Sequence, residues 1–373
     1  MHHTTRLFAT AVLGIVLTAS MAAAAPADDS NGGVATPMPR AKQLKIVGGS
    51  AAKADEFPFA VNIHVRGISA CGATLISDRW VYTAAHCLID YTASSNAGSN
   101  VKYQAAQLTL NIGKLSNATT TPLAVKQTIV HPDYVYSGST YDAGLIELTQ
   151  PITFSDAVQP IKLLLKEAQI PRDQVYTVVG WGRNEANQKS PFLQRVDLPS
   201  AKEDACVQAQ GDFEKQRDQL LCVGNTQGKD TCRGDSGGPL LIQVRSSGGT
   251  GKAAAEAWVQ AGVTSFGANT MGLDPNLCGT SGAIGFYART DFFASWVAQS
   301  TGMSISQFAS ELPPMFTNIK SDVVSINGSG NQTGSNATAS ASQSSDAASF
   351  AAPSLLALSL TTVGALLQAY CFA

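Results

Sequence analysis

The stretch KDTCRGDSGGPL, residues 229–240, places a single serine, Ser236, between an aspartate and a pair of glycines. Gly, Asp and Ser favour tight turns for backbone reasons alone, so the simplest interpretation is a turn. The same residues also suit a nucleophile on a bend, where backbone amides face a reacting carbonyl. The sequence on either side of this stretch has to distinguish the two interpretations.

Short apolar runs separated by turn residues flank the stretch on both sides. In FAVNIHVRG, from Phe59, apolar residues alternate with smaller or polar ones, as in a half-buried strand. Many short strands with Gly-rich turns predict an all-β sandwich or barrel. A helix is predicted after Thr290, a suitable N-cap, from apolar residues at helical spacing: Phe292, Phe293, Trp296 and Val297.

The composition allows a folded protein with a substantial core. Of the 373 residues, 44% are hydrophobic and 14% are charged, and the net charge is -2. A chain of this length can form one large domain or two ordinary ones. It lacks the basic surplus that nucleic-acid binding needs, so no nucleic-acid partner is expected.

The first residues resemble an export signal. Arg6 precedes the apolar segment Leu7 to Ala19, and small residues follow. This order is typical of a secretory signal peptide, which we assign to residues 1–24, and the apolar part is short for a membrane span. Secretion through the endoplasmic reticulum implies an oxidising compartment in which cysteines pair.

The other end has a polar segment followed by an apolar one. Residues 301–346 end in a stretch rich in Ser, Thr and Asn that predicts a solvated stalk, and residues 347–373 end in an uncharged tail. Small residues before such a tail are the layout of a GPI-anchor signal, which predicts a lipid-anchored protein at the cell surface. The alternative is a single C-terminal transmembrane helix, although such a span is usually followed by cytoplasmic Lys or Arg.

Four N-x-S/T sequons are candidate glycosylation sites: Asn117, Asn327, Asn331 and Asn336. Seven cysteines are present, and Cys371 lies in the apolar tail. The remaining six imply three disulfides, for which spacing alone allows fifteen pairings. No C-x-x-C pair supports a zinc site.

Three histidines lie outside the signal peptide. His86 stands in TAAHC beside a cysteine, His64 lies in a strand where a structural role is expected, and His131 lies in a turn where we expect it to be solvated. Asp142, in YDAGLIEL, stands at the entrance to an apolar strand. A carboxylate beside a buried strand needs a partner, because unpaired burial is costly.

Together these motifs resemble one family. IVGG from Ile46, then TAAHC, YDAGLIEL and GDSGGPL in this order, are similar to the trypsin/chymotrypsin-like serine endopeptidases, in the trypsin-like subgroup. The resemblance covers residues 46–300. It implies two perpendicular antiparallel β-barrels and a C-terminal helix, with the site between the barrels.

The resemblance assigns chemical roles to named residues. Ser236 is the implied nucleophile, His86 its base and Asp142 the partner of the imidazole, with Ser265 in contact with that aspartate. The amides of Gly234 and Ser236 form the implied oxyanion hole. A peptide hydrolase of this kind needs no cofactor.

The resemblance also implies activation and specificity. Residues 25–45 become a propeptide, and cleavage between Lys45 and Ile46 frees an amine that pairs with Asp235. Asp230 lies at the floor of the primary pocket, whose open walls include Gly267 and Gly285. An acid there favours cleavage after Arg or Lys.

The family pairing of the cysteines is Cys71–Cys87, Cys206–Cys222 and Cys232–Cys278. The segment NIGKLSNATTTPL carries no acid where some trypsins bind calcium, so no metal site is expected. Arg233 flanks the pocket mouth and is expected to disfavour basic residues beyond the cut. Expected partners are protein or peptide substrates and protein protease inhibitors, and the protein is expected to be a monomer.

Two other interpretations remain open at this point. The chain could be a non-catalytic binding protein on the same fold, because fold does not dictate function. It could also be an esterase of another fold, since GDSGG matches G-x-S-x-G literally. That motif requires a strand-to-helix setting, which the sequence around Ser236 does not suggest.

Overall fold

The computed structural model describes residues 46–93, 101–117, 122–165, 170, 173–184, 186–224, 226–245, 256–274 and 277–310. The expected signal peptide, propeptide and lipid-anchor signal lie outside these residues, as does the stalk beyond Ser310. Among the described residues, no helix has the length and apolar character to cross a membrane.

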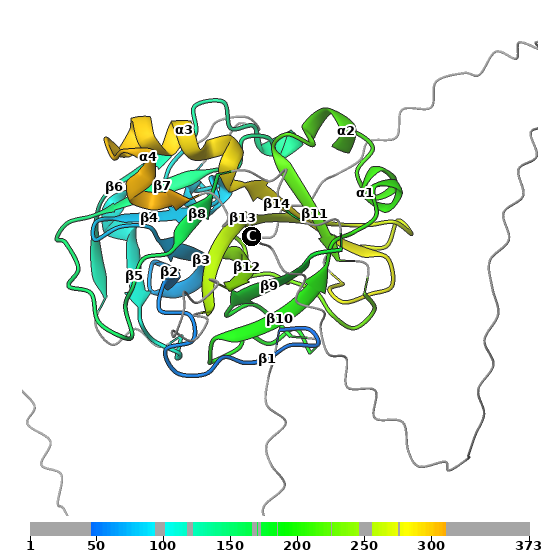
Figure 1. The fold of residues 1–373 in the computed structure, drawn as a ribbon, viewed down its shortest axis with the longest axis horizontal. Helices are drawn as coiled ribbons and strands as arrows, with labels where there is room; N and C mark the ends of the chain where they lie inside the picture. The colour runs from blue at the N-terminus through cyan, green and yellow to red at the C-terminus, as the bar shows by residue number, and fades with distance from the viewer. Residues whose placement is uncertain are drawn as a thin grey trace, which may run out of the picture. The chain divides into compact units, whose positions relative to one another are not determined.

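The first half of the described chain forms a closed six-stranded barrel in the order β2-β3-β4-β7-β6-β5. Its strands are β2 (Ala60–Val65), β3 (Ile68–Leu75), β4 (Trp80–Thr83), β5 (Leu108–Ile112), β6 (Leu123–Val130) and β7 (Gly144–Leu148). Short 3-10 turns connect them: η1 (His86–Leu88), η2 (Ala105–Gln107) and η3 (Tyr136–Gly138). In Figure 1 these strands gather on the left, in blue to cyan.

The second half forms a larger sheet with the main path β1-β10-β9-β12-β13-β14-β11. Its strands are β1 (Ser50–Ala51), β9 (Val175–Gly180), β10 (Gln194–Pro199), β11 (Leu220–Gly224), β12 (Pro239–Arg245), β13 (Glu256–Asn269) and β14 (Ala283–Arg289). A bridge between Ser200, which follows β10, and Val223 of β11 brings the two ends of this sheet together. The closed barrel, the second curled sheet and the few helices match the all-β, two-barrel expectation.

The described residues form four α-helices beside the sheets: α1 (Glu203–Ala209), α2 (Phe213–Gln216), α3 (Thr290–Thr301) and α4 (Ile305–Phe308). The helix predicted after Thr290 is therefore confirmed as α3. Its N-cap is Arg289, however, and Thr290 is its first helical residue. The Thr290 hydroxyl contacts the carbonyls of Leu164, Gln260 and Ala261, so it ties the helix start to the second sheet instead of capping the helix.

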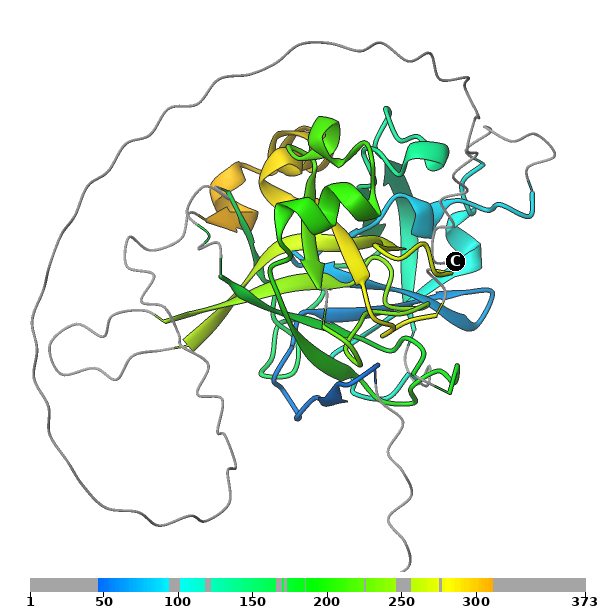
Figure 2. The ribbon, with the colours of Figure 1, turned by 90° about the vertical axis from the view of Figure 1, so that its right-hand side faces the viewer.

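The folded chain continues past the expected boundary at residue 300. After α3, α4 leads into β15 (Ala309–Ser310), which pairs in parallel with β8 (Lys162–Leu164). Phe308 is fully buried, and the ammonium group of Lys162 donates to the carbonyls of Ser306 and Gln307. Figure 2 shows α3 in yellow beside α4 and β15 in orange. The C-terminal extension, residues 302–310, is thus part of the domain.

Candidate active site

His86 is held at the end of a barrel strand. β4 ends at Thr83, and His86 begins the 3-10 turn η1, where only 3% of the residue is exposed. The neighbouring Cys87 forms a disulfide with Cys71 of β3, which fixes the turn to the barrel. The ring atom Nε2 of His86 lies 3.6 Å from the Cys87 sulfur.

Asp142 lies just before β7 and is 1% exposed. Its Oδ1 accepts the backbone N–H of His86 at 2.9 Å, and its Oδ2 lies 2.8 Å from Nδ1 of the same residue. The Ser265 hydroxyl donates to Oδ2 at 2.5 Å, from a register shift in β13 between Thr264 and Phe266. Burial alone raises the pKa of Asp142, but the charge of His86 and the hydrogen bonds from His86 and Ser265 hold that pKa below its ordinary value.

Ser236 lies on the loop between Cys232 and β12. Its carbonyl accepts the amide of Gly72 at 2.7 Å, which ties the loop to β3. Gly237 has a φ of 76°, and a Cβ placed on it would lie 3.1 Å from the Cys87 sulfur. Gly234 has a φ of 96°, a left-handed conformation that glycine adopts without strain. The loop therefore packs against the same disulfide that flanks His86.

Asp235 points into the protein and is fully buried. Its two oxygens accept the amides of Gly182 and Cys232, at 2.8 and 2.9 Å. Burial raises the pKa of Asp235 to about 7, against the pull of these two hydrogen bonds. Ile46 is also fully buried and lies in the core of the second sheet. Lys45, the other predicted activation residue, lies outside the described residues.

Asp230 lies beside the N-terminal segment of the described chain. Its amide donates to the carbonyl of Val47 at 3.2 Å, and its carboxylate accepts the amide of Gly279 at 3.0 Å. Burial raises the pKa of Asp230 to about 6. The two predicted wall residues, Gly267 and Gly285, are register partners on β13 and β14. A side chain on Gly285 would collide with Tyr287, since its Cβ would come within 2.9 Å of that ring.

Comparison with known proteins matches the trypsin family model to residues 46–297. The chain belongs to the trypsin family.

Relatives of the chain in this family include proteins from insects and from a mammal. Over 262 residues it is 32% identical to trypsin 5G1 of Aedes aegypti, covering 69% of this chain and 86% of that protein. Over 276 residues it is 30% identical to tryptase of Mus musculus, covering 70% of this chain and 91% of that protein. Over 269 residues it is 31% identical to phenoloxidase-activating factor 3 of Holotrichia diomphalia, covering 69% of this chain and 72% of that protein. The protein is thus a trypsin-like serine protease, and proteins are its substrates.

All three disulfides that the trypsin resemblance implied are present: Cys71–Cys87, Cys206–Cys222 and Cys232–Cys278. The first disulfide lies beside His86. The sulfurs of Cys71 and Cys87 and a ring nitrogen of His86, all atom types that bind metals, lie within 4.8 Å of one another. Both sulfurs are bonded to each other, so they offer no thiolate to a metal. Ser236 is followed by the strand β12 and not by a helix, which excludes the esterase of another fold.

The other two histidines have different surroundings. His64 is buried in β2, and its Nε2 lies 3.3 Å from the Asn111 amide, as a structural histidine should. The expectation that His131 is solvated is wrong, because its side chain is only 10% exposed. Its ring stacks on Tyr141 at 4.9 Å and meets Trp296 of α3 at 5.0 Å. The local turn sequence could not show this contact, since α3 lies far away in the chain.

Asn117 is the one sequon among the described residues. Its side-chain amide donates to the carbonyl of Ser190 at 2.9 Å. The three sequons of the stalk, Asn327, Asn331 and Asn336, lie outside the described residues.

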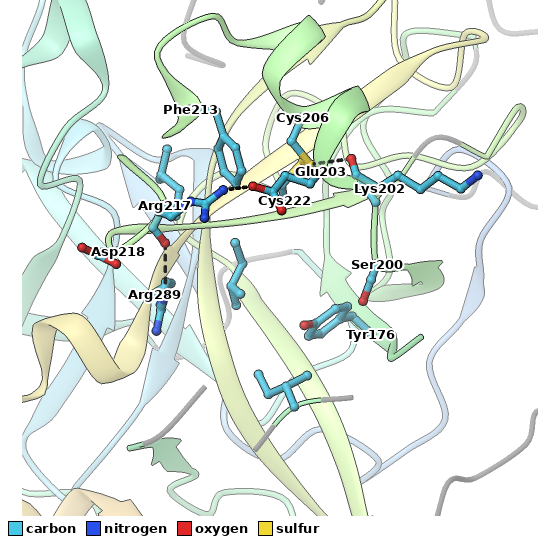
Figure 3. A pocket seen from close by; sticks show the side chains of 14 residues that line it. Tyr176, Ser200, Lys202, Glu203, Cys206, Phe213, Arg217, Asp218, Cys222 and Arg289 are labelled. Carbon is cyan, nitrogen blue, oxygen red and sulfur yellow. Dashed lines mark hydrogen bonds and ion pairs between the residues drawn. A yellow bond between two sulfur atoms is a disulfide. The ribbon is translucent and has the colours of Figure 1, made fainter. Parts of the chain in front are cut away.

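A separate cavity of about 550 Å³ lies between α1, α2 and β11 (Figure 3). Arg217 pairs there with Glu203, and Arg289 donates to the Arg217 carbonyl. None of the predicted active-site residues lines this cavity, so it is distinct from the candidate active site.

Proposed function

We propose that the protein is a secreted serine endopeptidase, made as a zymogen, that cleaves peptide bonds after Arg or Lys. The observation that carries this proposal is the chain of contacts from Ser265 to Asp142 to His86, beside the loop that carries Ser236. The low pKa of Asp142 keeps it charged at neutral pH, as a partner of an imidazolium must be.

In the proposed reaction, Ser236 Oγ attacks the scissile carbonyl carbon while Nε2 of His86 removes its proton. The negative charge on the carbonyl oxygen is stabilised by the amides of Gly234 and Ser236. The C–N bond then breaks, and His86 returns the proton to the leaving amine. A water molecule, deprotonated by the same imidazole, attacks the acyl-enzyme and releases the acid and Ser236.

The preference for Arg or Lys rests on Asp230. A carboxylate with a raised pKa gains from a cationic partner. The proposed walls, Gly267 and Gly285, are register partners without side chains of their own. Substrates that differ only at the residue before the cut test this preference directly.

Activation is proposed to occur by cleavage between Lys45 and Ile46. In the uncut chain the Asp235 carboxylate accepts the amides of Gly182 and Cys232, and burial raises its pKa. Ile46 already lies buried in the second sheet, and a new ammonium group on it would supply a positive charge to pair with the Asp235 carboxylate. Lys45 itself fits the proposed specificity, so the mature enzyme can activate its own precursor.

The deciding experiment uses the secreted protein after cleavage at Lys45. A fluorogenic peptide ending in Arg should be hydrolysed, and the Ser236→Ala variant should show no turnover. No turnover in the wild type would favour a non-catalytic binding role on the same fold, and turnover that survives the substitution would show that Ser236 is not the nucleophile.

Anchoring at the cell surface is proposed from the sequence of the tail, which lies outside the described residues. Phosphatidylinositol-specific phospholipase should release the protein from intact cells if a GPI anchor is attached. Retention, with a mass that includes Cys371, would favour the transmembrane alternative.

A further inference from the structure

Two basic side chains lie beside the loop that carries Ser236. Lys189 and Arg183 face each other across a β-bridge and are both half-buried. The amide of Arg183 donates to the carbonyl of Arg233 at 2.9 Å, which ties this hairpin to the loop. The Cε atom of Lys189 lies 3.8 Å from the place that a Cβ on Gly234 would occupy. Positive charge therefore borders the proposed oxyanion hole.

The charge of Lys189 is poorly compensated. Its ammonium group donates to the carbonyl of Ser69, which uses one of three N–H donors. In the part of the chain that the structure describes, no carboxylate forms an ion pair with Lys189 or Arg183. Burial and the charge of Arg183 lower the pKa of Lys189, opposed by the charge of Asp235. The oxygens of Asp235 are held by Gly182 and Cys232, so this carboxylate does not neutralise the ammonium group directly.

The geometry of His86 shows where the leaving part of a substrate must pass. In the proposed reaction Nε2 delivers a proton to the leaving amine, and this atom lies 3.6 Å from the Cys87 sulfur. Cys87 is bonded to Cys71, and Ser69 precedes Cys71 by two residues on β3. Two strand residues span about 7 Å, so a leaving segment that runs along β3 from Cys71 comes level with Ser69 at its first or second residue.

The residue before the cut lies elsewhere. Asp230 contacts Val47 and Gly279, whereas Lys189 contacts Ser69 of the first barrel. The acyl part and the leaving part of a substrate thus meet opposite charges, a carboxylate at one end and an ammonium group at the other.

We propose that Lys189, with Arg183 beside it, forms a subsite for an acidic side chain at the first or second residue after the cleaved bond. This inference rests on the proposed function, because a leaving group exists only if the protein cleaves peptides. An Asp or Glu there supplies the carboxylate that Lys189 lacks, while a basic residue meets like charge. The preferred substrates are therefore protein segments with Arg or Lys before the cut and an acid just after it.

The test uses the mature protease and two quenched fluorescent peptides that differ at one position. Both contain Arg before the cut, and the second residue after it is Glu in one and Gln in the other. We expect kcat/KM to favour Glu about two- to fivefold at low salt, the upper part of the range of a partly exposed ion pair. The ratio should shrink as salt is added, because screening weakens such pairs. In Lys189→Gln the ratio should approach one, and in Lys189→Glu it should favour Gln.

Matched controls separate the possible failures. Lys202→Gln changes a lysine at the remote cavity of Figure 3 and should leave the Glu/Gln ratio unchanged. An Arg substrate with only a dye after the cut has no residue for the subsite, so it reports folding and basic activity of each variant. No turnover of the dye substrate by the wild type would overturn the proposed function. Turnover with a Glu/Gln ratio near one, or a ratio that Lys189→Gln preserves, would overturn the subsite alone.

Discussion

Asp142 belongs to the first barrel, and it accepts a hydrogen bond from the hydroxyl of Ser265, which lies on β13 of the second sheet. In Ser265→Ala a buried carboxylate oxygen loses this hydrogen bond, at a cost of about 1–2 kcal/mol. The same loss raises the pKa of Asp142 and weakens its hold on the imidazole. We expect kcat on an Arg-dye substrate to fall about five- to twentyfold with KM little changed. Steady-state kinetics would measure this, with the exposed Ser155→Ala as control, and an unchanged kcat would contradict it.

Asp230 leads to a prediction about pH. Its carboxyl has a pKa of about 6, raised by burial, so the neutral form dominates below that pH and the charged form above it. A cation in the pocket pairs only with the charged form. The Kd of an aromatic amidine should therefore rise about tenfold per unit as pH falls below 6. Calorimetry can follow this, and a Kd in Asp230→Asn with the same pH dependence would argue against Asp230 as the pocket floor.

Among single residues, the confirmed sequence prediction is the pairing of the six cysteines, which is the one that the resemblance implied. The motifs also placed His86 next to Asp142, as the structure has them, while the catalytic roles of His86, Asp142 and Ser236 stay predictions. His131 shows the limit, because a turn motif describes the backbone and not what packs on the ring from α3. The sequence analysis did not single out Lys189 for the same reason, because Ser69, the residue that it contacts, lies 120 positions away in the chain.

At the scale of elements, the C-terminal extension is the main difference from expectation. The sequence of α4 and β15 is short and carries one large buried residue, Phe308, so no periodic pattern marks it. Its parallel pairing with β8 is a contact between distant segments, which local patterns cannot reveal. The start of α3 differs by one residue, because Thr290 bonds to strand carbonyls and leaves the cap position to Arg289.

The extension should contribute measurably to stability. Phe308→Ala removes a fully buried ring, which costs about 3–5 kcal/mol in a packed core. Ile305→Ala, in the same helix but 37% exposed, should cost clearly less and serves as control. Denaturant unfolding of the inactive Ser236→Ala protein would measure both. Equal losses for the two variants would mean that α4 and β15 are only loosely attached.

At the scale of the whole molecule, the candidate site is built where the two halves meet. His86 and Asp142 come from the first barrel, while Ser236 and Ser265 come from segments of the second sheet. The order of motifs predicted this assembly through resemblance to a family. Distances such as 2.8 Å between the imidazole and the carboxylate follow from packing that no motif encodes.

The proposed pairing of the Ile46 ammonium group with Asp235 should appear as a pH effect on the stability of the protease domain. In the uncut chain burial raises the pKa of Asp235 to about 7, from 3.8. Between about pH 4 and 7 the folded precursor keeps a proton that the unfolded chain releases, so its stability falls as pH rises through this window. After cleavage the Ile46 ammonium group favours the charged carboxylate and removes this loss.

The measurement compares the free energy of unfolding of Ser236→Ala protein, uncut and cut after Lys45 by an added protease, at pH 5 and pH 8. The titrating groups that both forms contain cancel in the difference. The new α-amino group of the cut form has an unfolded pKa near 8, so it contributes little between pH 5 and pH 8. We expect the uncut form to lose about 2–4 kcal/mol more than the cut form over this range. In the Asp235→Asn background the two forms should respond alike to pH. If the uncut and cut forms with Asp235 intact lose the same free energy of unfolding between pH 5 and pH 8, the Asp235 carboxylate is already paired before cleavage and activation needs another trigger.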